Sequence, residues 1–367
     1  MSVHKMSKSW FWDWVANKVE VKIGIVSVTI ASLFLIFALA LAKFNTTDKY
    51  PEFNIIDEAR QREFGAFTVK VTTGMFIKNF SVFDVVRNRF VADCILWFEY
   101  NSDEIMLDTI NLFSFDNGRI LKKSQADIKI QGRRTIAKYD VRVEFKSLLE
   151  YHKFPLEDHR ISLILTNNFV TPYEMFFHVD NAFFNTAEGI FIPNWKIRDM
   201  NTDSGYASPQ LDSRDNAKKV SYPLASFTLN VEKDGIRKVL VIFLPLFLAI
   251  FLAIFSFLTG KANSRGRITL ASSAMTALLG YRFVIENMLP AVGYFTTTDS
   301  IYILLLALAF SIFVYQILLA RGTFAVEKVL KSAKKVEHKK FIYSVIDTLG
   351  LFIVTTTLVF GTWMSVF

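Results

Sequence analysis

Apolar residues gather in long runs along this chain. Four runs stand out at residues 23–43, 239–258, 301–320 and 341–367, and a weaker one lies at 268–289. A helix of about 20 apolar residues crosses the roughly 30 Å of hydrocarbon in a bilayer, because each residue adds about 1.5 Å. The pattern therefore predicts five membrane-spanning helices, the last one ending near residue 363.

Between the first two runs the pattern changes to a period of two. "FTVKVTTGMF" alternates Phe67, Val69 and Val71 with polar residues, as a half-buried strand does. Further strand-like runs are "FVADCILWFEY", "YDVRVEF", "ISLILTN", "NWKIRDM" and "ASFTLNV", with turn signals "DNG" and "QGRR" between them. Short strands without helical periodicity between them predict an antiparallel β-sandwich or barrel over residues 67–236, and we favour the sandwich.

Two polar segments border these strands. Residues 44–66 form a connector after the first apolar run, and we expect a helix over 47–63. Residues 201–221 are almost wholly polar, which predicts a mobile loop between two strands.

The formal net charge of +8 is concentrated beside the spans. Lys and Arg residues precede the first span, separate the second from the third, and separate the fourth from the fifth. Cytoplasmic loops carry such an excess. We therefore place segment 1–22 in the cytoplasm and the strand-rich domain and the carboxyl terminus outside. This placement argues against a nucleic-acid partner, and binding of membrane lipid headgroups is compatible with it.

The first apolar run has two interpretations. "FALALAKF" has small residues at the spacing of a signal-peptidase site, so the run fits a removed export signal. The preceding segment is long for such a signal, and Trp10, Trp12 and Trp14 fit an interfacial belt. We favour a retained membrane anchor at residues 23–43, and the export signal stays open.

Candidate catalytic and metal-binding groups are sparse. Cys94 is the only cysteine, which excludes an intrachain disulfide and cysteine metal clusters. His152 and His159 lie near carboxylates but lack a convincing metal-ligand spacing. Without a Ser-His-Asp set or a Gly-x-Ser-x-Gly elbow, we expect no enzyme activity, no cofactor and no metal site.

The weakest span, "RITLASSAMTALLGYRFVIENMLP", carries a stripe of small polar residues. A helix turns about 100° per residue, so positions three and four apart share one face. The stripe consists of Thr269, Ser273, Thr276 and Gly280, and Phe283 lies in line with them on the same face. Close helix packing and a water-facing surface both explain it. Charges at the two ends favour water: Arg265, Arg267, Arg282 and Glu286. One helix cannot enclose water, so this interpretation requires several copies around an axis.

The order of elements resembles a pentameric ligand-gated ion channel of the Cys-loop receptor superfamily. "YHKFPLEDHR" resembles the family's loop built on aromatic-Pro-x-Asp, without the flanking cysteines, as in the prokaryotic members. "ITLASS" resembles the start of the pore-lining helix, and "NMLPAVGYFTTTDS" resembles the linker after it. The resemblance covers residues 67–367 and is strongest from Arg237 onward.

The resemblance implies a ligand-gated ion channel in a bacterial inner membrane. Domain 67–236 would sense a small extracytoplasmic ligand or a proton, and 237–367 would form a four-helix channel domain within a homopentamer that passes inorganic ions. The implied pore-lining residues are Arg265, Thr269, Ser273, Thr276, Gly280, Phe283 and Glu286. The implied coupling residues are Asp84, Pro155, Asp158, Arg237, Pro290 and Tyr294, with Asp84, Asp158 and Arg237 in a buried ion cluster. The implied ligand-binding residues are Tyr100, Tyr206 and Tyr222.

The chain departs from the family in three ways. A helix precedes the exported domain, and the Trp-x-Pro motif of the agonist pocket is missing. The cytoplasmic mouth carries Arg265 and Arg267 where cation-selective members place an acidic residue, so we predict an anion preference. A weakly selective or cation-selective pore is the alternative, since Glu286 acts in the opposite sense.

A non-conducting receptor or scaffold of the same fold is the rival interpretation. Proton sensing is a further hypothesis for the channel, because four titratable residues crowd the coupling loop and His titrates near neutral pH. These residues are Glu150, His152, Glu157 and His159.

Overall fold

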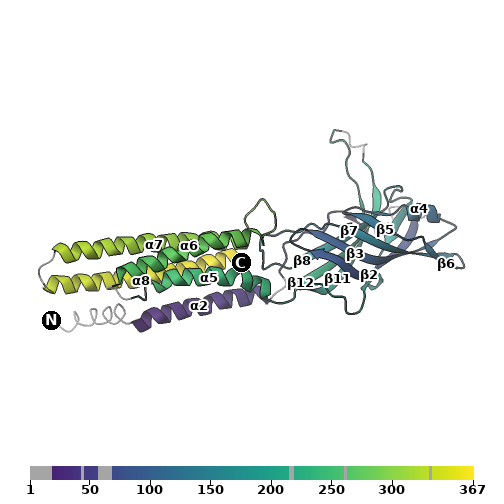
Figure 1. Cartoon of the computed structure of the whole chain (residues 1–367). Helices are drawn as coiled ribbons and strands as arrows, with labels where there is room; N and C mark the ends of the chain where they lie inside the picture. The colour runs from purple at the N-terminus through teal and green to yellow at the C-terminus, as the bar shows by residue number, and fades with distance from the viewer. Residues whose placement is uncertain (1–18, 43–44, 57–67, 215–218, 260–262, 330–332) are drawn as a thin grey trace, which may run out of the picture. The chain divides into compact units, whose positions relative to one another are not determined.

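The structure is a computed structural model that describes residues 19–42, 45–56, 68–214, 219–259, 263–329 and 333–367. Within these ranges it describes the side chains of all residues except 322–342. The chain divides into two units, whose helices and strands are labelled in Figure 1. The helical unit includes α2, the segment Tyr151–Glu157 and Ile236–Phe367. The sheet unit comprises Asn45–Glu150 and Asp158–Gly235. Most of the predicted segment 1–22 lies outside the described residues.

Five helices among the described residues are long and apolar enough to cross a membrane. They are α2 (Val19–Leu41), α5 (Arg237–Phe255), α6 (Ser264–Glu286), α7 (Thr297–Val329) and α8 (Ala333–Val366). The five predicted apolar helices are therefore confirmed in length and composition. The weakest of them, α6, begins at a defined cap, where the Asn263 side chain accepts a hydrogen bond from the Gly266 N–H at 3.0 Å.

Helix α2 packs against the other helices of its unit. The Phe37 ring lies 4.9 Å from the Phe243 ring and 5.7 Å from the Phe247 ring, both on α5. Its residues Val26 and Leu33 are also buried. Burial of apolar side chains along α2 shows that it is a packed element of the helical unit.

The strands of the sheet unit form two sheets. The five-stranded sheet has the order β1-β11-β12-β8-β4, and the seven-stranded sheet has β10-β2-β3-β7-β5, with β6 on β7 and β9 on β2. Their bounds are β1 Asn54–Ile55, β2 Val69–Asp84, β3 Arg89–Asn101, β4 Ser114–Phe115, β5 Gly118–Lys123, β6 Asp127–Gln131, β7 Arg134–Phe145, β8 His159–Thr166, β9 Met175–His178, β10 Phe184–Thr186, β11 Trp195–Ala207 and β12 Tyr222–Lys233. Short helices α4 (Leu107–Asn111) and η1 (Asn181–Phe183) lie between strands.

All six strand-like runs of the sequence overlap strands in the described part of the chain, with Phe67 of the first run outside it, and alternation explains why. In β7, buried and more exposed residues alternate along the whole strand. Apolar side chains from both sheets meet in the core, where the Phe184 ring of β10 lies 5.3 Å from the Phe227 ring of β12. The predicted turn at "QGRR" is also present, with Gly132 at a positive φ of 65° between β6 and β7.

Three expectations for this unit were wrong. The sheets are not wholly antiparallel, because β9 and β10 both pair with β2 in parallel. The described part of the connector is not helical, since β1 pairs with β11, and residues 57–63 lie outside the described residues. Residues 201–207 are not a loop but belong to β11, where ladder hydrogen bonds with β12 override their polar composition. Residues 215–218 of the same polar segment lie outside the described residues.

Candidate functional site

The polar stripe of α6 is exposed along its whole length in the single chain. All seven predicted positions are exposed: Arg265, Thr269, Ser273, Thr276, Gly280, Phe283 and Glu286. The opposite face is packed, and four of its residues have no exposed surface: Ala271, Ala274, Leu278 and Ile285. The small-residue stripe therefore does not serve helix packing within the chain, where other residues of α6 perform that role.

Two hydroxyl groups on the stripe are hydrogen-bonded to their own helix. Thr269 Oγ1 donates to the Arg265 carbonyl at 3.0 Å, and Thr276 Oγ1 donates to the Ser272 carbonyl at 3.0 Å. Back-bonding of this kind satisfies the hydroxyl hydrogen inside the helix. The oxygen lone pairs remain available on the exposed side, so the stripe presents acceptors on a narrow surface. At Gly280, no atom lies within 4 Å of where a Cβ would be.

The two arginines at the amino-terminal end of α6 have different environments. Arg265 is exposed, as predicted. Arg267 is 2% exposed, donates from Nε to the Ser256 carbonyl at 2.8 Å and forms an ion pair with Asp347 of α8. Placing Arg267 with Arg265 at an open mouth was therefore wrong, because two residues along a helix point in nearly opposite directions.

The carboxyl-terminal end of α6 carries a three-membered ion cluster. Arg282 lies 2.6 Å from Glu286 of the same helix and 2.8 Å from Asp299 at the start of α7. Asp299 also accepts hydrogen bonds from the backbone N–H and hydroxyl of Thr296. The Glu286 side chain remains 64% exposed. This cluster ties α6 to α7, and its one arginine is shared between two carboxylates.

The segment Tyr151–Glu157, part of the predicted coupling loop, is bonded to the linker between α6 and α7. The Tyr151 N–H donates to Tyr294 Oη at 2.8 Å, and the His152 ring stacks on the Tyr294 ring at 4.1 Å. The carbonyls of His152 and Phe154 accept hydrogen bonds from Thr297 and Thr298 at the start of α7. Tyr294, predicted to act in coupling, therefore contacts a segment whose two ends continue directly into the sheet unit.

The other predicted coupling residues have local partners. Asp158 is 7% exposed and accepts from the N–H groups of Asn45 at 2.9 Å and Lys233 at 3.1 Å. Asp84 accepts from the Arg87 N–H at 3.0 Å, and Arg237 is exposed at the first residue of α5. Pro155 and Pro290 are both buried. The contacts described for Asp84 and Asp158 do not join them, and the predicted cluster with Arg237 stays a prediction.

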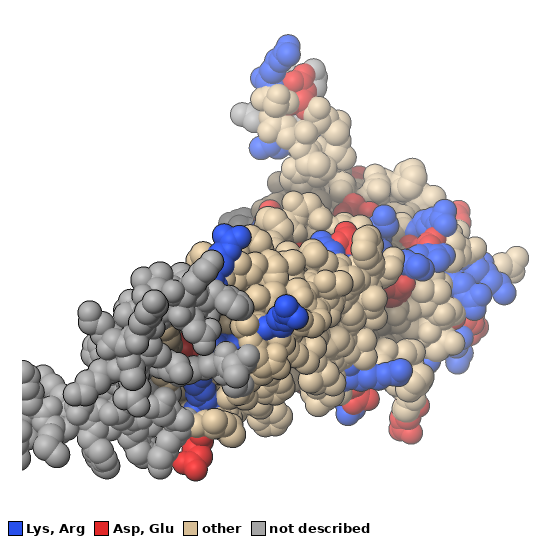
Figure 2. All heavy atoms as spheres, turned by 60° about the vertical axis from the view of Figure 1, so that its left-hand side comes forward, with Lys and Arg blue, Asp and Glu red and all other residues tan. Residues whose placement is uncertain are grey.

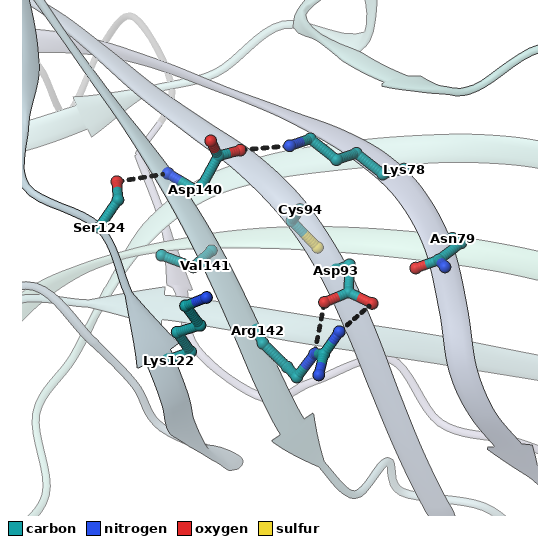
Figure 3. A pocket seen from close by; sticks show the side chains of 9 residues that line it. All are labelled: Lys78, Asn79, Asp93, Cys94, Lys122, Ser124, Asp140, Val141 and Arg142. Carbon is teal, nitrogen blue, oxygen red and sulfur yellow. Dashed lines mark hydrogen bonds and ion pairs between the residues drawn. The ribbon is translucent and has the colours of Figure 1, made fainter.

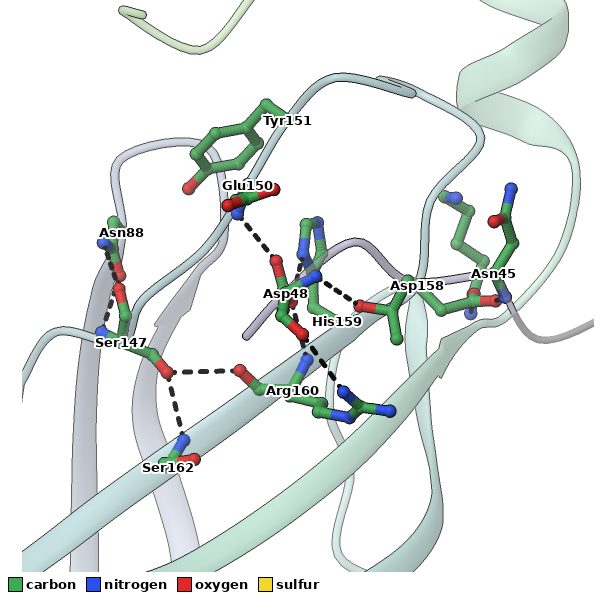
Figure 4. A network of polar contacts seen from close by, with 12 residues as sticks. Asn45, Asp48, Asn88, Ser147, Glu150, Tyr151, Asp158, His159, Arg160 and Ser162 are labelled. Atoms are coloured by element: carbon green, nitrogen blue, oxygen red, sulfur yellow. Dashed lines mark hydrogen bonds and ion pairs between the residues drawn. The ribbon is translucent and has the colours of Figure 1, made fainter. Parts of the chain in front are cut away.

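A polar network missed by the sequence interpretation surrounds Asp48 of the connector. One carboxylate oxygen accepts from the Glu150 N–H at 2.7 Å, and the other accepts from the Arg160 N–H at 2.8 Å and contacts His159 Nδ1 at 2.9 Å (Figure 4). The side chains of Asp48 and His159 are 0% and 2% exposed. The carboxylate can only accept in this contact, so Nδ1 carries the proton. No sequence motif marks Asp48, whose role depends on the fold of β8.

The three predicted ligand tyrosines lie in different environments. Tyr100 on β3 is 4% exposed, and burial raises its pKa, as expected for a core side chain. Tyr206 on β11 and Tyr222 at the start of β12 are partly exposed and lie near each other, since Tyr206 pairs with Pro223. Burial and the neighbouring Asp116 raise the pKa of Tyr222. The strand start predicted at Tyr222 is confirmed.

A shallow hollow of about 540 Å³ lies on the seven-stranded sheet (Figure 3). Two ion pairs cross it: Lys78 with Asp140, and Arg142 with Asp93 at 2.5 Å. Its cations are therefore largely balanced by carboxylates of the same sheet. On the face shown in Figure 2, charged side chains gather over the strands, whereas the helices present a mostly uncharged surface.

The described residues contain no group of three His, Cys, Asp or Glu side chains that could hold a metal ion. No protein-family model matches the chain, and no curated protein is significantly similar to it.

Proposed function

We propose that this protein is a subunit of a ligand-gated ion channel whose pore is lined by α6. In this proposal, the sheet unit is an extracytoplasmic β-sandwich, α5 to α8 form a four-helix membrane bundle, and α2 is an additional helix. The observation that carries the proposal is the exposed polar stripe of α6, which lies opposite a fully packed apolar face.

The ends of the stripe explain why it would face water and not lipid. Arg265 is exposed at one end, and Glu286 at the other. Charged side chains near the ends of a membrane helix lie at the water interface, and a water-filled path would connect these two ends along the polar side chains between them. A ring of identical chains would place every stripe around a common axis. In the family that the sequence resembles, this ring is a homopentamer.

Arg265 would set the ion preference. Under the proposed topology, with the amino terminus in the cytoplasm, Arg265 lies at the cytoplasmic mouth. Unit charges about 8 Å apart interact by roughly 2 kcal/mol at an effective dielectric of 20. Glu286 opposes this field, because its neighbour Arg282 is shared with Asp299 and the three side chains keep one net negative charge. An anion-preferring pore follows, with a weakly selective or cation-selective pore as the alternative.

Gating would begin in the sheet unit, through a small ligand or a proton. The segment Tyr151–Glu157 would transmit the change, because it is bonded to Tyr294 and to the start of α7 and continues at both ends into sheet strands or loops.

Purified protein in liposomes with asymmetric potassium chloride tests the proposal. We expect currents or anion flux that protein-free liposomes lack. The reversal potential should be shifted from zero toward the chloride equilibrium potential. A pH series and a screen of small ligands would identify the gating signal. A protein that assembles correctly and passes no ions under any of these conditions would favour the non-conducting receptor.

A further inference from the structure

A buried carboxylate joins three helices at the amino-terminal ends of α2 and α6. Asp347 of α8 lies 2.5 Å from Lys22 Nζ of α2 and also pairs with Arg267 of α6. The exposed fractions of these side chains are 1% for Asp347, 10% for Lys22 and 3% for Arg267. The two cations therefore share one carboxylate in a region nearly closed to solvent.

Carbonyl groups at the end of α5 partly offset the remaining positive charge. Lys22 Nζ donates to the Phe257 carbonyl at 2.9 Å, and Arg267 Nε donates to the Ser256 carbonyl at 2.8 Å. Carbonyls at the end of a helix lack intrahelical partners and carry the negative end of the helix dipole. Lys22 thus bonds the end of α5 and Asp347 of α8, and Arg267 bonds the same end of α5 and the same carboxylate.

Arg267 helps to set the rotation of α6 about its axis, together with packed residues such as Ala271 and Leu278. Two residues along an α-helix differ by about 200° in direction, so the buried position of Arg267 turns Arg265 to the opposite, exposed side. Any change in how Asp347 and Ser256 hold Arg267 would change the direction of Arg265.

We propose that Lys22 of α2 is a positioning residue for α6. By bonding both Asp347 and the Phe257 carbonyl, it keeps the groups that hold Arg267 in place, and hence sets the direction in which Arg265 points. Helix α2 is then a working part of the helical unit and not a passive anchor. The consequence for ion preference rests on the proposed function, whereas the positioning itself does not.

The test measures how fast a thiol at position 265 reacts with a water-soluble, positively charged methanethiosulfonate. The Arg265→Cys variant of the full chain supplies the thiol, since Cys94 is 1% exposed. Adding Lys22→Met should change the reaction rate severalfold, because Asp347 and the end of α5, which hold Arg267, then lose the side chain that connects them. Lys22→Arg should restore the original rate, because it keeps the charge.

The matched control is Arg321→Met, which removes an exposed cation at another helix and should leave the rate unchanged. We expect the Lys22→Met variant to fold, because Arg267 and Asp347 remain as a charge-balanced pair. If it does not fold, Lys22→Gln replaces it in the experiment. Equal rates at position 265 with and without Lys22 would overturn the proposal, even if the unfolding temperature falls.

Ion flux separates this inference from the proposed function. In a conducting protein, Lys22→Met should also shift the reversal potential, and Arg321→Met should not. A protein without flux would contradict the proposed function, and the rate at position 265 would still decide the role of Lys22.

Discussion

Arg267 of α6 and Asp347 of α8 form an ion pair whose side chains are only 3% and 1% exposed. Removing one partner of a buried pair leaves an uncompensated charge, at a cost of about 3 to 5 kcal/mol. This pair therefore fixes the packed face of α6, and Arg265 is left as the exposed arginine at that end of the helix.

Neutralising Arg265 should weaken the anion preference. With Arg265→Gln, we expect the chloride-to-potassium permeability ratio to fall by roughly tenfold, since screening reduces a bare interaction of about 2 kcal/mol. Reversal potentials in asymmetric potassium chloride measure this ratio. Arg321→Gln, at an exposed site on α7, is the control, and an unchanged ratio in Arg265→Gln would exclude Arg265 from the ion path.

A thiol on the stripe should react with water-soluble reagents, whereas a thiol at a lipid-facing position should not. Thr276 of α6 and Thr357 of α8 are both exposed in the chain, and both donate their hydroxyl to the carbonyl four residues earlier. We expect Thr276→Cys to react with a charged methanethiosulfonate, with a change in current, because thiolates form only in water. Thr357→Cys should stay unmodified. Equal reactivity at the two sites would contradict a pore lined by α6.

Removing the Asp48 carboxylate should destabilise the sheet unit. Asp48→Ala leaves the N–H groups of Glu150 and Arg160 and the His159 ring without their buried acceptor, so we expect a loss of about 3 kcal/mol in the free energy of unfolding. Asp127→Ala is the control, since Asp127 is 64% exposed and 4.0 Å from Lys138. Its effect should stay below about 1 kcal/mol. Thermal unfolding measures both, and similar losses would refute a special role for Asp48.

The Arg142–Asp93 pair should make stability depend on pH in the acidic range. The hydrogen bond from Arg142 holds the pKa of Asp93 below its ordinary value of 3.8. A lowered pKa stabilises the folded state above pH 3.8, and this contribution disappears as the pH falls through the lowered pKa.

Arg142→Gln should therefore reduce stability near neutral pH, and only slightly, because the pair is partly exposed. The difference from the unmodified protein should vanish in strong acid. Unfolding temperatures across a pH series measure it, with the exposed Arg133→Gln as control. A difference that persists in strong acid would point to lost packing and not to the charge.

Cys94 should be inert in the folded protein. Its thiol is 1% exposed, and burial raises its pKa to about 12. The reactive thiolate is therefore scarce at pH 8, and the buried sulfur is hard to reach. We expect negligible labelling of the native chain by a maleimide and complete labelling in denaturant. Rapid labelling of the native chain would show that β3 opens readily.

The apolar helices and the main strands followed from local patterns. Alternation along β7 and the unbroken apolar run of α5 depend on which face of an element is buried, and the sequence shows this directly. The stripe of α6 was predicted for the same reason, because helical spacing places Thr269 and Thr276 on one side. Its exposure in the single chain agrees with that prediction.

Relationships between distant segments needed the tertiary structure. Nothing near Arg267 in the sequence reveals that Asp347, 80 residues later, lies beside it. A single carboxylate within an apolar helix indicates only that it has some buried partner. Asp48 and residues 201–207 are similar cases, since their partners come from β8 and β12. The sequence by itself determined which surfaces are apolar and which are polar; only the tertiary structure decided which charges are buried together, because ion pairs form between side chains that meet after folding.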